Sequence, residues 1–138
     1  MTKEFRIYII AFLFPFTLLG QSKNVDCSNI KNGTFYFYPA NSQSKFVILR
    51  SDSIQEEINI SKADTSFWRV SWRNDCMLNL KFIRKSHPIS DDERQFYNSH
   101  TSVVKVLSVT KNYYAFKAGL DSISTTNPLT DTLWLKEK

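Results

Sequence analysis

Apolar and polar residues alternate with a period of two in most segments from Gly33 onward, a pattern typical of β-strands with one buried face. The clearest example is SFWRVSWRNDCMLNLKF, from Ser66 to Phe82, in which two alternating runs flank Asn74 and Asp75. Because successive side chains of a strand point to opposite faces, each run has one apolar row. These rows are Trp68, Val70 and Trp72 in the first run and Cys76, Leu78, Leu80 and Phe82 in the second.

The length of the turn between these two runs decides whether their apolar rows meet. A two-residue turn at Asn74-Asp75 would pair Arg73 with Cys76. The apolar row of each run would then share a face with the polar row of the other run. A three-residue loop, 73–75, instead pairs Trp72 with Cys76, Val70 with Leu78 and Trp68 with Leu80. Because a slip of one residue would expose the whole apolar set, we predict the three-residue loop, with both tryptophans facing the core.

The remaining alternating runs predict further strands and one helix. The runs are 33–38, 45–50, 53–60, 101–110, 113–118 and 132–136. Between two of them, Ser90 and Glu93 have the spacing of a capping box, which predicts a short helix over 91–97. Short connections indicate an antiparallel meander of about eight strands, and closure into a small barrel would remove its two exposed edges. The predicted fold class is therefore all-β.

The first residues have the pattern of a secretory signal peptide. Lys3 and Arg6 precede an apolar run from Ile7 to Leu19, and the small residue Gly20 follows. That run is shorter than the roughly 20 residues of a membrane-spanning helix. We therefore expect a signal peptide over 1–20 and a single β-barrel domain over 21–138, exported to the periplasm or secreted, without a membrane span after cleavage.

Charge and cysteine content restrict the partners of such a domain. The formal net charge is +5, and the basic residues are scattered rather than clustered, so no nucleic-acid partner is expected. Cys27 and Cys76 are the two cysteines. In an oxidising compartment they are expected to form a disulfide, and the alternative is two buried free thiols. Their spacing of 49 residues fits no metal-binding motif. No cofactor is predicted.

Several short motifs resemble those of a group of small, exported, lipocalin-like bacterial proteins of uncharacterised function. The motifs are Gly-x-Phe after a cysteine (Cys27, Gly33, Phe35), Ile-x-Arg (Ile48, Arg50), Gln-x-Glu (Gln55, Glu57) and Trp-x-x-Asp-Cys-x-x-x-Leu (Trp72, Asp75, Cys76, Leu80). The resemblance implies an exported lipocalin-like barrel and supplies no catalytic residue. Such chains sometimes carry the name of a topoisomerase subunit, a role that a short exported β domain does not support.

No catalytic constellation is evident, so we expect a protein that is not an enzyme. His87 and His100 flank the predicted helix and are interpreted as solvated loop residues. No serine lies in a Gly-x-Ser-x-Gly elbow. Three glycines in the whole chain are too few for a phosphate-binding loop.

A cluster of polar residues follows the second predicted strand. A two-residue turn at Ser51-Asp52 would place Arg50, Gln55 and Glu57 on one face of a hairpin. If that face points inward, the barrel contains a polar cluster among aromatic side chains, as in ligand-carrying barrels. If the opposite face is the core, the cluster lies in water, as most charged residues do. The sequence leaves both arrangements open.

The leading functional hypothesis is a binding module that holds a small, largely apolar ligand inside the barrel. The candidate ligand-binding residues are Arg50, Gln55, Glu57, Trp68 and Trp72. The alternative is a structural or protein-interaction component of the cell envelope with a filled barrel. An internal cavity would distinguish the two.

Overall fold

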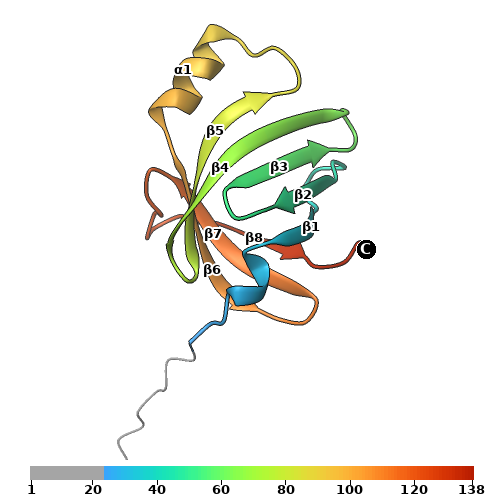
Figure 1. Cartoon of the computed structure of the whole chain (residues 1–138), viewed down its shortest axis with the longest axis vertical. Helices are drawn as coiled ribbons and strands as arrows, with labels where there is room; N and C mark the ends of the chain where they lie inside the picture. The colour runs from blue at the N-terminus through green and yellow to red at the C-terminus, as the bar shows by residue number, and fades with distance from the viewer. Residues whose placement is uncertain (1–23) are drawn as a thin grey trace, which may run out of the picture.

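The computed structural model describes residues 24–138, which form a closed, eight-stranded antiparallel barrel (Figure 1). Each strand pairs with its neighbours in chain order, and pairing of the first strand with the last closes the barrel. The strands are β1 (Gly33–Phe37), β2 (Phe46–Arg50), β3 (Ile54–Asn59), β4 (Asp64–Asn74), β5 (Met77–Lys85), β6 (Ser102–Val109), β7 (Tyr113–Leu120) and β8 (Leu129–Trp134). The predicted all-β barrel is confirmed, whereas the predicted signal peptide, 1–20, lies outside the described residues.

Inward-facing rows from all around the barrel form one core, as the alternating pattern predicts. Tyr114 and Leu78 are fully buried, and Phe35 is 2% exposed. Phe35 and Tyr114 meet edge to face with their ring centroids 5.5 Å apart. Since these two aromatic side chains come from β1 and β7, they join strands that are distant in the sequence.

The β4–β5 hairpin has the predicted faces but not the predicted register. Trp72 pairs with Leu78 and Val70 pairs with Leu80. Each partner lies two residues further along β5 than predicted. The turn lies at Asp75-Cys76, where the Asn74 side chain accepts a hydrogen bond from the backbone N–H of Cys76 at 3.0 Å. The extra residue forms an irregularity between Trp72 and Asn74. A shift of two residues keeps each side chain on its predicted face.

The β2–β3 hairpin differs from its prediction in the same way. The predicted turn at Ser51-Asp52 would pair Arg50 with Ser53 and Ile48 with Gln55. In the structure, Arg50 pairs with Gln55 and Ile48 pairs with Glu57. The reason is that the turn is displaced by one residue: the backbone N–H of Ser51 donates to the carbonyl of Ile54 at 2.8 Å. The strand faces are again unchanged.

The helix α1 (Asp91–Ser99) begins as predicted and ends two residues later. Ser90 and Glu93 form the predicted capping box. The helix lies beside β5 at one end of the barrel (Figure 1). Tyr97 stacks on Phe82 with ring centroids 4.3 Å apart, but Phe96 is exposed. The sequence pattern of the helix places Phe96 and Tyr97 under the end of the sheet, and the structure bears this out for Tyr97 alone, because only one face of a short helix packs inward.

The polar segment before β1 closes the other end of the barrel. It contains a short 3₁₀ helix, Ser28–Ile30. Ile30 and Cys27 are among the most buried residues, with 0% and 1% of their surface exposed. We call this segment, 27–30, the plug.

Candidate functional site

A cavity of about 270 Å³ lies inside the barrel, and every strand except β4 contributes to its wall. Its lining is mostly aromatic and aliphatic, with a polar cluster on β2 and β3. The lining residues are Phe37, Phe46, Ile48, Arg50, Gln55, Glu57, Leu80, Ser102, Val104, Phe116, Ala118, Leu129 and Leu133. An apolar hollow with a few convergent polar groups is the usual form of a small-molecule site.

The structure resolves the question that the sequence leaves open, because Arg50, Gln55 and Glu57 face the interior. Arg50 donates from Nε to Oε1 of Gln55 at 2.6 Å. Gln55 in turn donates from Nε2 to Oε1 of Glu57 at 2.8 Å. The three side chains thus form a hydrogen-bonded chain along the cavity wall.

Arg50 is held from the closed end of the barrel as well. Its guanidinium donates to the carbonyl of Ile30 at 3.0 Å and to the hydroxyl of Tyr114 at 2.9 Å. It also lies 5.1 Å from the ring centroid of Phe35. Because a buried charge is tolerated only with such partners, Arg50 is a fixed part of the structure that also forms the polar end of the cavity.

The carboxyl group of Glu57 is the other charged group of the cluster. Burial raises its pKa above the ordinary value of 4.5, against the opposing effects of the Gln55 hydrogen bond and the Arg50 charge. The Trp68 indole N–H also favours the charged form, although it forms no hydrogen bond of normal geometry within residues 24–138. The Tyr114 pKa is raised as well, mainly by burial.

The raised pKa of Glu57 predicts a pH-dependent effect of Glu57→Gln. A carboxyl group with a raised folded-state pKa binds its proton more tightly in the folded protein than in the unfolded chain. The resulting stabilisation is fully present below the unfolded-state pKa, near 4.5, and is lost as the pH rises through the folded-state pKa. Glutamine can still accept from Gln55 but never ionises. The melting temperature of the variant should therefore rise relative to the wild type between about pH 4 and about pH 8.

Glu56→Gln is the matched control for this prediction, since Glu56 is the neighbouring residue of β3 and points away from the cavity. Its melting-temperature difference from the wild type should change less over the same range. Equal pH dependence of the two variants would contradict the description of Glu57.

The two tryptophans do not line the cavity, contrary to the prediction for Trp68 and Trp72. Both belong to β4, the strand that contributes no lining residue. Trp68 packs edge-on against Phe82 and Tyr97, with ring centroids 5.4 and 5.8 Å apart. Trp72 lies beneath Lys31, whose Nζ is 5.4 Å from its ring centroid. Their inward direction is correct, because both pack against the buried core, but neither lines the hollow.

Two partners of the polar cluster escaped the sequence analysis. Tyr114 shares an inward row with Phe116 and Ala118, so the alternation of β7 contained the signal. Ile30 is an isolated apolar residue in a polar segment, and its contribution is a backbone carbonyl. No side-chain pattern identifies a backbone acceptor.

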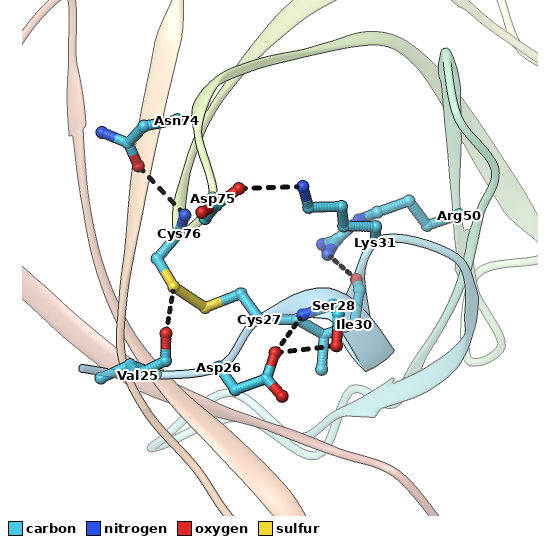
Figure 2. Close-up of a disulfide and its surroundings, with 10 residues drawn as sticks. All are labelled: Val25, Asp26, Cys27, Ser28, Ile30, Lys31, Arg50, Asn74, Asp75 and Cys76. Carbon is cyan, nitrogen blue, oxygen red and sulfur yellow. Dashed lines mark hydrogen bonds and ion pairs between the residues drawn. A yellow bond between two sulfur atoms is a disulfide. The ribbon is translucent and has the colours of Figure 1, made fainter. Parts of the chain in front are cut away.

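The predicted disulfide joins Cys27 to Cys76 and fixes the plug to the β4–β5 turn (Figure 2). Beside it, Lys31 and Asp75 form an ion pair of 3.5 Å. Figure 2 also shows the hydrogen bond from Arg50 to the Ile30 carbonyl. The covalent link therefore holds in place a segment that supplies one acceptor of the buried guanidinium.

Both histidines form hydrogen bonds with aspartates outside the cavity lining. Nδ1 of His87 lies 3.1 Å from Asp64, and Nδ1 of His100 lies 2.6 Å from Asp121. The pKa of each aspartate is lowered, chiefly by the hydrogen bond with its histidine. Within residues 24–138, no group of three or more His, Cys, Asp or Glu could hold a metal ion.

Comparisons of the chain with family models, curated proteins and solved structures found no significant match. The resemblance to exported lipocalin-like proteins therefore stays a prediction. No helix in the described part of the chain is long and apolar enough to cross a membrane.

Proposed function

We propose that the protein is an exported binding module, without catalytic activity, that holds a small, largely apolar ligand inside its barrel. The observation that carries this proposal is the cavity of about 270 Å³, with its apolar wall and polar cluster. The alternative, an envelope component with a filled barrel, requires side chains to occupy this volume. The hollow therefore favours ligand binding.

The size of the cavity limits the ligand. Its volume of about 270 Å³ is near the lower end of the range for ligand pockets, roughly 300–1,000 Å³. An apolar cavity of about 150 Å³ binds benzene. By proportion, the ligand of this protein has about ten non-hydrogen atoms.

Export is supported by two independent features. The first is the pattern of a basic start and an apolar run before Gln21. The second is the Cys27–Cys76 disulfide, since such bonds persist in oxidising compartments. The intact mass of the exported product should correspond to a chain that begins at or near Gln21, whereas a full-length product would contradict export.

Binding can be tested with propylbenzene, which has nine carbon atoms, by isothermal titration calorimetry. We expect saturable binding at one site per chain. Ala118→Phe should weaken it at least about tenfold, because the added phenyl ring fills much of the hollow that the probe needs. Ala118 lines the cavity and belongs to the inward row of β7.

Ala115→Phe adds the same group on the outer face of β7 and should leave the affinity unchanged. Melting temperatures of both variants check that the barrel still folds. Absence of saturable binding to the wild type, or an equal loss in both variants, would overturn the proposal.

A further inference from the structure

The hydrogen bonds of the polar cluster run in one direction. Arg50 donates to Gln55, and Gln55 donates to Glu57. Arg50 has two further acceptors, Ile30 and Tyr114. Only the donations from Arg50 to Gln55 and from Gln55 to Glu57 lead toward Glu57. Within residues 24–138, the second oxygen of Glu57, Oε2, accepts no hydrogen bond, and the Trp68 indole N–H beside the carboxyl group forms none of normal geometry. The chain of donors ends in an unused acceptor.

An unused acceptor on the cavity wall selects a ligand that donates. A carboxylate oxygen accepts hydrogen bonds and cannot donate them while ionised. The remaining polar group of the lining is the hydroxyl of Ser102, which can both donate and accept and therefore selects nothing. Glu57 is consequently the lining residue that favours a head group with a hydrogen-bond donor.

The charges of the cluster favour a neutral donor. Arg50 and Glu57 both line the cavity, and their charges are opposite when Glu57 is ionised. A cationic head group would leave one positive charge in excess in an apolar enclosure, where an unpaired charge is costly. An anionic head group would meet the Glu57 carboxylate, and like charges at short range repel each other. A hydroxyl group avoids both penalties.

The remaining lining fits an apolar body. Three phenylalanine side chains, Phe37, Phe46 and Phe116, line the same hollow as Glu57. Burial of an aromatic or short alkyl group against them is favourable in proportion to the area removed from water. The head group and the body thus have separate partners in one cavity.

We infer that the ligand is an uncharged, predominantly apolar alcohol whose hydroxyl group donates a hydrogen bond to Glu57. This inference rests on the proposed function, since it specifies the chemistry of the ligand for the same cavity. The directional hydrogen bonds, the balanced charges and the aromatic lining each support it.

Four probes with one apolar body test the head group by calorimetry at neutral pH. They are 3-phenylpropan-1-ol, its methyl ether, 3-phenylpropanoate and 3-phenylpropylammonium. We expect the alcohol to bind at least about tenfold more tightly than the ether, because a hydrogen bond to a charged group is worth about 1.5–3 kcal/mol. Both ions should bind more weakly than the alcohol.

Glu57→Met supplies the matched test, because methionine has a similar length and no carboxylate. In this variant the preference for the alcohol over the ether should disappear. Glu56→Met, on the opposite face of β3, should retain it. The wild-type series remains decisive even if Glu57→Met does not fold.

The outcomes separate this inference from the proposed function. Tighter binding of the ether or of either ion than of the alcohol would overturn the hydroxyl head group and leave ligand binding intact. An unchanged alcohol preference in Glu57→Met would overturn the role of Glu57. No binding of any of the four probes or of propylbenzene would overturn both proposals together.

Discussion

Replacing Arg50 by methionine should lower the free energy of unfolding by about 3–5 kcal/mol, because it leaves several buried hydrogen-bond acceptors unsatisfied. Methionine fills much of the arginine volume, so packing is largely retained. The Ile30 carbonyl and the Tyr114 hydroxyl would each lose a hydrogen bond from Arg50. Glu57 would also lose the positive charge that lines the same cavity.

Urea denaturation at neutral pH measures this loss, and Arg69→Met is the control. Arg69 is exposed on β4, so its replacement should change the free energy of unfolding by no more than about 0.5 kcal/mol. A near-neutral Arg50→Met would mean that the guanidinium is not buried among these acceptors. The polar end of the cavity would then be described incorrectly.

Removing the disulfide in the double variant Cys27→Ala/Cys76→Ala should cost about 4 kcal/mol. The bonded cysteines are separated by 49 residues, and in the chain-entropy model closure of such a loop destabilises the unfolded chain by about that amount. The plug would also lose its covalent attachment to the β4–β5 turn. Urea unfolding of the variant and the wild type gives the difference.

Thiol alkylation provides the control for the disulfide prediction. The unreduced, unfolded wild type should contain no reactive thiol, and the same protein after reduction should contain two. If the unreduced wild type already reacts, the bond is absent in the isolated protein. If the double variant is as stable as the wild type, the plug does not depend on the bond.

Side-chain direction could be predicted from the sequence more securely than strand register. The rows of Trp68, Val70 and Trp72 and of Leu78 and Leu80 face the side that the alternation predicts. Their cross-strand partners lie two residues further along β5 than predicted, because the position of the turn sets the register. A shift by two residues preserves every face, so the alternation cannot detect it.

Turn position depends on local hydrogen bonds that composition does not specify. At the β4–β5 turn, the side chain of Asn74 binds the backbone of Cys76 and moves the turn toward the disulfide. At the β2–β3 turn, Ser51 and Ile54 close the backbone one residue later than predicted. In both hairpins, residues that favour turns occur at the predicted and at the observed turn positions, so the sequence is compatible with a turn at either position.

The inner face of β2 and β3 could not be chosen from their own residues. Both faces carry a charged residue, Glu56 on one and Glu57 on the other. The choice is explained by Ile30 and Tyr114, which satisfy the buried Arg50 from segments 20 and 64 residues away. The residue pattern of a single strand cannot predict hydrogen bonds between a buried polar group and such distant segments.

Methyl nuclear magnetic resonance during a titration with propylbenzene tests ligand binding in the barrel most directly. The proposed function predicts that the methyl groups of Ile48, Leu80 and Val104, which line the cavity, shift saturably with one common dissociation constant. The outward methyl groups of Leu49 and Leu107 should not move. Unchanged cavity methyl groups, or shifts confined to the outward ones, would contradict ligand binding inside the barrel.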